Sequence, residues 1–182
     1  QRQMCIRDSY LEGGFIMEYK IINMQKEHWE QVKQIYWEGI ETGIATFQTE
    51  IPSYEQWDNS HLKFGRFVAC NEEKVLGWVA LSSTSSRCVY SGVVEISLYI
   101  GKDFRGNGIG KALMKEAIKQ GEEKGIWSFY SAIIEENIAS IELHKKCGFR
   151  EIGTREKIAK LSNGKWSDTV LMEFRSKTVG IG

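Results

Sequence analysis

The feature that most constrains the fold is an alternating strand that leads directly into a glycine-rich turn. Between Val93 and Ile100, aliphatic residues alternate with Glu95, Ser97 and Tyr99, which places the two sets on opposite faces of a sheet. The sequence RGNGIGK follows at residues 105–111, and residues 111–124 have the apolar spacing of a helix. This order predicts a strand, a tight turn and a helix start in one unit.

The rest of the chain predicts a single mixed domain, residues 17–182, without an internal repeat or a domain linker. Apolar spacing changes repeatedly between the strand period and the helix period, and Ser53 to Gln56 has the form of a capping box. Strands are expected at residues 19–24, 66–70, 75–82, 93–100, 127–134, 150–158 and 166–174, and helices at residues 26–42, 53–64, 111–124 and 140–147.

Composition and charge limit the classes of partner. The 182 residues carry 24 basic and 24 acidic side chains, so no overall field attracts nucleic acid or an anionic membrane. The four cysteines form no CxxC pair and no cluster with histidine at metal-ligand spacing, and no apolar run approaches membrane-spanning length. We therefore expect a cytoplasmic protein with reduced thiols and no bound metal.

Residues 1–16 differ in character from the rest of the chain. They have neither the apolar core nor the cleavage site of a signal peptide. The run QMCIRDS resembles a translated sequencing adaptor, and Met17 followed by EYKII resembles a natural start. We expect residues 1–16 to be an artefactual leader and leave them out of the functional argument.

The glycine-rich turn has the composition of a diphosphate-binding loop. N–H groups at a helix start have no partner within the helix and attract anions, while glycines let the backbone approach a ligand closely. The spacing matches neither a P-loop nor the dinucleotide-binding GxGxxG pattern. A tight turn that needs glycine for geometry alone is the alternative. The loop comprises Arg105, Gly106, Asn107, Gly108, Ile109, Gly110 and Lys111.

Two elements in the correct order resemble the GCN5-related N-acetyltransferase (GNAT) superfamily. RGNGIG is similar to its Q/R-x-x-G-x-G/A signature, and Asn137, Ser140 and the pair Gly148-Phe149 are similar to its second element. The resemblance implies an α/β (α+β) GNAT fold, in which about four helices flank a mixed, mostly antiparallel sheet of about seven strands. It also implies that acetyl-coenzyme A is the cosubstrate.

The resemblance also implies where the cofactor binds. The main chain of Leu98, Tyr99 and Ile100 is expected to pair with the pantetheine arm as if that arm were an added strand. Residues 105–111 are expected to hold the pyrophosphate. Asn137 and Ser140 are expected near the pantetheine or the thioester, although a helix N-cap explains these two residues almost as well.

His144 stands where most of the superfamily has tyrosine, and this narrows the resemblance. The phosphinothricin and methionine sulfoximine N-acetyltransferases also have histidine there, and the chain resembles them over nearly its whole length after Met17. The matching stretches are residues 40–42, 46–50, 87–90, 94–100 and 163–168, together with Trp57. This resemblance implies acetylation of the amine of a small amino-acid analogue, a role in detoxification, and a homodimer.

Glu95 is the expected general base of such a reaction. A carboxylate on a strand rich in Val, Ile and Leu is partly buried, and burial raises its pKa and makes it a better proton acceptor near neutrality. An ordinary ion pair at a strand edge is the alternative, and the resemblance favours the base. His144 is the second candidate, as a group that relays a proton or protonates the leaving sulfur; a hydrogen bond within its helix is the alternative. A covalent route through Cys147 is disfavoured because no base is identifiable beside it.

Four residues are expected to bind the acceptor: the resemblance implies Arg87, Phe47 and Tyr90, and the strand period places Ser97 on the same face as Glu95. Arg87 is expected to hold its carboxylate, because a guanidinium can make two parallel hydrogen bonds to that group; a solvated loop arginine is the alternative. Phe47 and Tyr90 are expected to line the pocket, with core packing as the alternative. Ser97 is expected to bond the substrate or Glu95.

Two further functions stay open from the sequence. One is a GNAT enzyme for another amine, such as a polyamine or a protein N-terminus, and Arg87 argues for an acceptor with a carboxylate instead. The other is a coenzyme A-binding sensor without turnover, against which Glu95 and His144 both argue, because a sensor needs the loop and no base.

Overall fold

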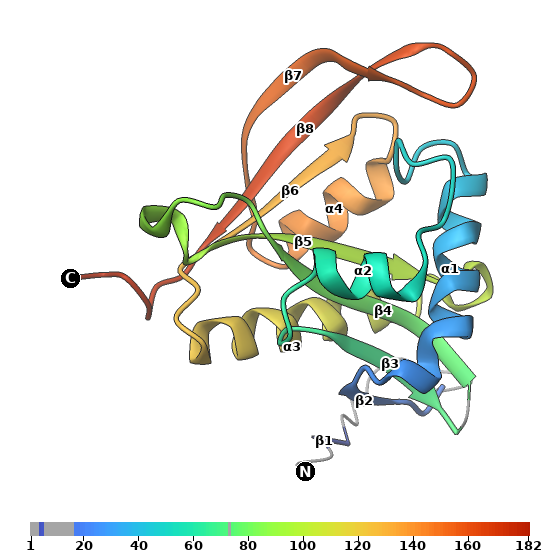
Figure 1. Cartoon of the computed structure of the whole chain (residues 1–182), viewed down its shortest axis with the longest axis horizontal. Helices are drawn as coiled ribbons and strands as arrows, with labels where there is room; N and C mark the ends of the chain where they lie inside the picture. The colour runs from blue at the N-terminus through green and yellow to red at the C-terminus, as the bar shows by residue number, and fades with distance from the viewer. Residues whose placement is uncertain (1–3, 6–16, 73) are drawn as a thin grey trace.

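The computed structural model describes residues 4–5, 17–72 and 74–182, which form one mixed sheet with helices on both faces (Figure 1). Within these residues the sheet has the strand order β1-β2-β3-β4-β5-β6-β8-β7, and every neighbouring pair is antiparallel except β5 and β6. The strands are β1 Met4–Cys5, β2 Lys20–Asn23, β3 Phe67–Asn71, β4 Lys74–Ser83, β5 Val93–Ile100, β6 Ser128–Ile134, β7 Arg150–Lys160 and β8 Trp166–Arg175. The helices are α1 Trp29–Glu41, α2 Tyr54–Ser60, α3 Ile109–Glu123 and α4 Ile138–Lys146, with short 3-10 helices η1 Lys26–His28, η2 Cys88–Tyr90 and η3 Lys102–Phe104.

The expected fold is therefore confirmed, with seven strands and four helices in the predicted order. The two-residue strand β1 adds to the edge of the sheet, where Met4 lies opposite Ile21 of β2. Apart from Met4 and Cys5, the leader expected at residues 1–16 lies outside the described residues. Its artefactual origin stays a prediction.

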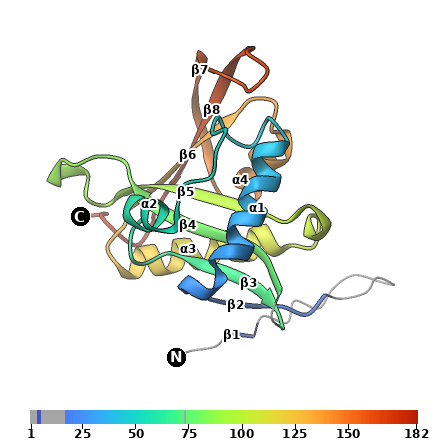
Figure 2. The same ribbon diagram turned by 45° about the vertical axis from the view of Figure 1, so that its right-hand side comes forward.

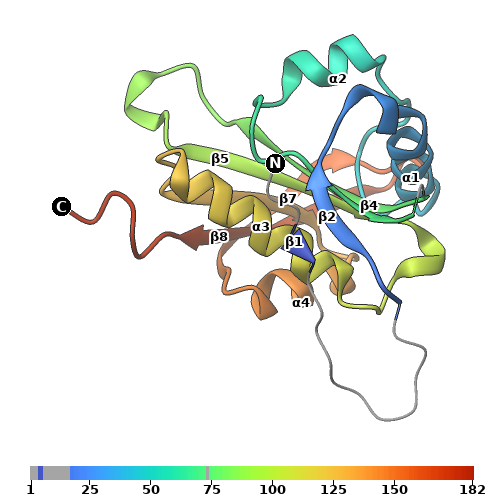
Figure 3. The same cartoon turned by 90° about the horizontal axis from the view of Figure 1, so that it is seen from below.

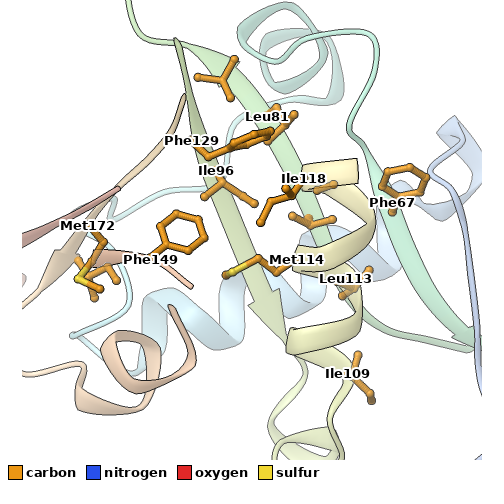
Figure 4. Close-up of a cluster of buried hydrophobic side chains, with 14 of the residues drawn as sticks. Phe67, Leu81, Ile96, Ile109, Leu113, Met114, Ile118, Phe129, Phe149 and Met172 are labelled. Carbon is orange, nitrogen blue, oxygen red and sulfur yellow. The ribbon is translucent and has the colours of Figure 1, made fainter. Parts of the chain in front are cut away.

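Helices cover the two sheet faces in pairs, as Figure 3 shows from below: α1 and α2 on one face, α3 and α4 on the other. The α1–α2 face packs aromatic residues, including the buried Trp29, Trp57 and Trp78. The α3–α4 face packs aliphatic side chains and methionines around the fully buried Phe129 (Figure 4). These two cores hold the sheet between its helix layers. The ends of its strands are left free to contribute to a functional site.

Strands β5 and β6 pair only at their beginnings. Residues 93–95 of β5 lie opposite residues 128–130 of β6, after which both strands continue without pairing to each other, to Ile100 and Ile134. Figure 1 shows the two strands diverging toward α4. The separation leaves backbone N–H and C=O groups of β5 without a strand partner on one side, and such groups need another partner when buried.

Local sequence signals placed most element boundaries correctly. Strand β5 has the predicted bounds, and the Ser53 hydroxyl accepts from the Gln56 N–H at 3.2 Å in the predicted capping box. The helix expected at 26–42 starts as the 3-10 turn η1, and the helix expected to reach residue 64 ends at Ser60 because His61 is extended. Helix α3 begins two residues earlier than expected, directly after Gly108.

The hairpin of β7 and β8 contains a large bulge. Arg155 lies opposite Thr169 and Ala159 opposite Ser167, so residues 156–158 of β7 face Asp168 alone. The Lys157 backbone, at a φ of 46°, donates its N–H to Asp168 Oδ1 at 2.7 Å and so holds the bulge in place. Figure 2 shows the hairpin rising beyond the helices. Bulges bend a strand and redirect its side chains.

Phe129 is the residue on which we expect the stability of this arrangement to depend most. Its side chain is fully buried, packs edge-on against Phe174 at 6.0 Å, and occupies the space beside Gly121 of α3. Phe129→Ala should lower the free energy of unfolding by about 3–5 kcal/mol because it leaves a cavity. Urea denaturation measures this, with Ile158→Ala, at a 48%-exposed position, as the control. A loss below about 1 kcal/mol for Phe129→Ala would contradict the packing described.

Candidate functional site

A cavity of about 860 Å³ lies where β5 and β6 separate. Its walls come mainly from α1 and the segment that follows it, β5, the turn before α3 and the start of that helix, β6 and α4. It brings together fifteen of the residues that the sequence singled out: Phe47, Glu95, Ser97, Leu98, Tyr99, Ile100, Arg105, Gly106, Gly108, Ile109, Gly110, Lys111, Asn137, Ser140 and His144. Three others, Arg87, Tyr90 and Asn107, do not line it.

The glycine-rich turn forms one end of this cavity. Gly106 and Gly108 adopt positive φ values of 81° and 75°, and a Cβ atom at either position would meet nothing within 4 Å. No side chain caps α3, so its first N–H groups stay open to a ligand. Asn107 instead braces the turn, because its Nδ2 donates to the carbonyl oxygens of Phe104 (3.2 Å) and Arg105 (3.3 Å).

The unpaired edge of β5 runs from this turn toward Glu95. Residues 98–100 line the cavity, and the Tyr99 side chain packs against the aromatic core. There the Tyr99 ring stacks on Trp78 with 4.9 Å between centroids and lies 4.9 Å from Tyr36. Burial raises the pKa of the Tyr99 phenol, so that group stays neutral. Any contact of Tyr99 with an extended ligand along β5 would therefore be made by its backbone.

Helix α4 contributes a hydrogen-bonded chain to the opposite wall. Asn137 is its N-cap, and the Asn137 Oδ1 accepts from the Ser140 N–H at 3.2 Å. The Ser140 carbonyl in turn lies 2.8 Å from His144 Nδ1. The capping role weighed for Asn137 is thus present, and no described residue accepts from the Asn137 amide nitrogen, which stays available to a ligand.

His144 is buried, with 3% of its surface exposed. A carbonyl can only accept, so Nδ1 carries the proton and Nε2 presents a lone pair; this Nε2 is buried without a partner in the described residues. Burial lowers the pKa of the imidazole, and the bond to the Ser140 carbonyl opposes this only partly. The resting His144 is therefore neutral, and its Nε2 can accept a hydrogen bond.

Glu95 lies at the point where β5 and β6 part. Burial raises the pKa of its carboxyl above the usual range, and the positive charge of Arg155 partly opposes that rise. Tyr130 is its neighbour across the parallel pair, and the Tyr130 hydroxyl is buried without a partner in the described residues. Glu95 makes no ion pair in the described part of the chain, so the strand-edge salt bridge considered as its alternative is not present there.

Arg87 and Tyr90 lie away from the cavity. They belong to the loop between β4 and β5, which projects from the body of the molecule in Figure 2, and the Arg87 guanidinium lies 5.3 Å from the centre of the Tyr90 ring. Val89 and Tyr90 are 65% and 45% exposed. Within this chain the two residues thus contact each other and not the pocket, and their role in substrate binding stays a prediction.

Sequence reasoning missed several residues in and around the site, of which four bear on its chemistry or shape. Tyr36 and Gly39 of α1 line the cavity, and a Cβ atom at Gly39 would lie 2.7 Å from the Tyr99 ring, which explains a glycine inside a helix. Tyr130 and Arg155 become neighbours of Glu95 only through strand pairing. The unexpected glycine was a usable signal for the first pair, whereas nothing local marked the second.

The structure also bears on the expectations for Cys147, for a metal site and for a membrane-spanning helix. Burial raises the pKa of the Cys147 thiol, which disfavours a reactive thiolate. Among the described residues no three His, Cys, Asp or Glu side chains are grouped so as to hold a metal ion, and the absence of a metal stays a prediction. A search of the same residues finds no helix with the length and apolar character needed to span a membrane.

Comparison with known proteins agrees with this geometry. The sequence model of the Acetyltransferase (GNAT) family matches residues 29–149. Phosphinothricin N-acetyltransferase of Alcaligenes faecalis is 30% identical over 149 residues, which cover 78% of this chain and 75% of that enzyme. The L-methionine sulfoximine/L-methionine sulfone acetyltransferase of Pseudomonas aeruginosa is 31% identical over 101 residues, 56% of this chain and 58% of that enzyme.

A solved structure extends the likeness to the fold and the ligand. The crystal structure of a GNAT superfamily phosphinothricin acetyltransferase from Sinorhizobium meliloti, in complex with AcCoA, matches with a TM-score of 0.81 and 26% identity. The match covers 90% of this chain and 91% of that one. The open turn, the unpaired edge of β5 and the family match agree, and the chain belongs to the GNAT family as an N-acetyltransferase that uses acetyl-coenzyme A.

Proposed function

We propose that the enzyme acetylates the amine of a small amino-acid analogue of the phosphinothricin, methionine sulfoximine or methionine sulfone type. One observation carries the proposal: a single cavity joins an anion-binding turn, an unpaired strand edge and a carboxylate of raised pKa. The names of the relatives indicate the class of acceptor, and the proposed role is the inactivation of such compounds.

The residues present fit acetyl-coenzyme A. The open space at Gly106 and Gly108 and the uncapped N-terminus of α3 suit a diphosphate, with Arg105 and Lys111 adding positive charge. The unpaired edge of β5 suits an extended arm that bears amide groups, as in strand addition. The bound cosubstrate supplies an acetyl group activated as a thioester.

Glu95 acts as the general base in this proposal. An alkyl amine is mostly protonated at neutral pH and must lose a proton before it attacks a carbonyl carbon. A partly buried carboxylate with a raised pKa accepts that proton more readily than an exposed one. Ser97, two residues along β5 on the same face, lines the cavity where it can hold the acceptor or orient Glu95.

His144 has a second role in this scheme, as an acceptor. His144 lines the cavity and its buried Nε2 has no partner in the described residues, so in this scheme it binds an N–H or O–H group of a ligand or receives a proton in transit. Donation of a proton to the leaving sulfur requires His144 to gain one first, because the resting imidazole has its proton on Nδ1.

Pairing of two copies in the cytoplasm completes the proposal. The β7–β8 hairpin exposes Ile152, Ile158 and Trp166 at 43%, 48% and 52%. Such apolar side chains gathered on one projecting element suit burial against another chain.

The described cysteines Cys70, Cys88 and Cys147 are free thiols, which agrees with a reducing compartment.

An acceptor panel tests the proposal directly. Thiol release from acetyl-coenzyme A is followed with phosphinothricin, L-methionine sulfone, spermidine, a peptide with a free N-terminus, and no amine. We expect release that depends on the two amino-acid analogues. Release with spermidine or the peptide alone would move the enzyme to another acceptor class. The absence of amine-dependent release with every compound would favour a coenzyme A-binding sensor.

Replacing the base should affect the chemical step. Glu95→Gln should lower kcat by about 10²–10⁴-fold at neutral pH, since an amide cannot accept the proton. In the wild type, kcat/KM should fall as pH decreases through the raised pKa of Glu95, and the variant should lose this limb of the profile. Glu151→Gln, on the exposed face of β7, is the matched control. Equal rates for wild type and Glu95→Gln at every pH would remove Glu95 as the base.

Closing the glycine-rich turn should affect cofactor binding. Gly108→Ala places a Cβ in the space proposed for the diphosphate and should weaken coenzyme A binding by tenfold or more, a loss of about 1.4 kcal/mol. Gly125→Ala is the matched control, because Gly125 also has positive φ (85°) and open space but follows the other end of α3. Isothermal titration calorimetry gives both dissociation constants, and equal affinities for the two variants would contradict the assignment.

A further inference from the structure

Arg155 lies on the same sheet face as the proposed base. It is opposite Thr169 of β8, and Thr169 is opposite Ile134 of β6; both of these neighbours line the cavity. Residues directly opposite one another share a face, and so do alternate residues along a strand. Counting back along β6 from Ile134 reaches Tyr130, which is opposite Glu95. Strand pairing therefore places Arg155 on the sheet face of Glu95, opposite Thr169 of the cavity wall, although Arg155 does not itself line the cavity.

Arg155 also differs from every other arginine in the described part of the chain. Arg66 and Arg150 pair with Asp58 and Glu173, and Arg175 donates to backbone carbonyls. Arg105 donates to the Ile100 carbonyl, and Arg87 lies over Tyr90. Arg155 makes no hydrogen bond, ion pair or ring contact with a described residue, and its side chain is exposed. Its five N–H donors are thus free for a ligand.

The positive charge of Arg155 acts on two ionisable side chains of this sheet face. It lowers the pKa of Glu95 and that of Tyr130, in each case against the larger effect of burial. Arg87 has no such effect on Glu95. The Tyr130 hydroxyl beside Glu95 is buried without a partner in the described residues, so it too can bond a ligand. Arg155 and the Tyr130 hydroxyl, neither of them bonded to a described residue, thus lie on the same sheet face as the Glu95 carboxylate.

We propose that Arg155, assisted by the Tyr130 hydroxyl, binds the carboxylate of the acceptor and so turns the amine toward Glu95. The inference rests on the proposed function, whose acceptors are α-amino acids, and names the residue that binds their carboxylate. The amine and carboxylate of such a compound are attached to the same carbon, so the groups that hold them must be neighbours. Arg155 meets this condition because it lies on the sheet face of Glu95 in the same chain and its charge acts on Glu95. A guanidinium binds a carboxylate through two parallel hydrogen bonds.

A bulge in β7 begins directly after Arg155. Arg155 is the last paired residue before residues 156–158, which the Lys157–Asp168 hydrogen bond holds out of register. A bulge next to an active site commonly re-aims a side chain. The hairpin thus supplies a specificity residue from a segment far along the sequence from Glu95.

A pair of acceptors separates carboxylate binding from other roles of Arg155. L-Methionine sulfone and its decarboxylated analogue, 3-(methylsulfonyl)propylamine, differ only in the carboxylate. Arg155→Gln should raise KM for the sulfone by tenfold or more and change kcat/KM for the amine by less than about twofold, since one charge-assisted pair is lost only with the former. Arg155→Lys should restore part of the loss, and Tyr130→Phe should raise KM for the sulfone alone.

Arg150→Gln is the matched control, because Arg150 is on the same strand and face but is held by Glu173 at 2.6 Å. Urea midpoints confirm that each variant folds, and Arg155→Lys carries the test if the glutamine variant does not. An equal loss of kcat/KM for both acceptors would overturn the inference. It would indicate that Arg155 acts on Glu95 or on folding instead. A selective loss with Arg87→Gln and none with Arg155→Gln would overturn it in favour of Arg87. If the wild-type enzyme acetylates neither compound, the proposed function itself is wrong. This outcome is distinguishable because it is measured before any variant is made.

Discussion

The structure depends on one interruption of backbone pairing, the separation of β5 from β6 after Glu95. A parallel pair that continued to Ile100 would satisfy its own backbone and close the cavity. Because the strands part, β5 keeps an unpaired edge between Glu95 near its start and the glycine-rich turn beyond its end. One strand thus links the position proposed for the acyl group with the position proposed for the diphosphate. Two cores hold the sheet from its opposite faces.

Charges and hydrogen bonds in the cavity are arranged for proton acceptance. Glu95 is partly buried and has no ion pair in the described residues, and His144 presents an unprotonated Nε2. Both groups can therefore take a proton or a hydrogen bond from a ligand, which suits the proposed acceptor if it enters as an ammonium ion. Proton donation to the leaving sulfur, the role that the sequence also suggested for His144, stays a prediction. It requires His144 to gain a proton on Nε2 first, because the Ser140 carbonyl fixes the resting proton on Nδ1.

The fold and the cofactor half of the site were predictable because their signals are local. Alternation gave the bounds of β5, the Ser53–Gln56 box gave the start of α2, and the glycines marked the turn before α3. The acceptor half was not, because it depends on pairing between distant segments. Arg155 approaches Glu95 through three strand pairs and a bulge set by Asp168, none of which leaves a periodic pattern. Arg87, close to Glu95 in sequence, lies on a projecting loop instead.

The central claim is that the main chain of β5 and of the glycine-rich turn binds acetyl-coenzyme A in the gap between β5 and β6. Amide hydrogen exchange with and without a saturating concentration of acetyl-coenzyme A tests it most directly. The account predicts slower exchange in residues 96–100 and 106–111, with the Gly125 turn unchanged. Saturation of the protein with no slowing in either segment would contradict the account.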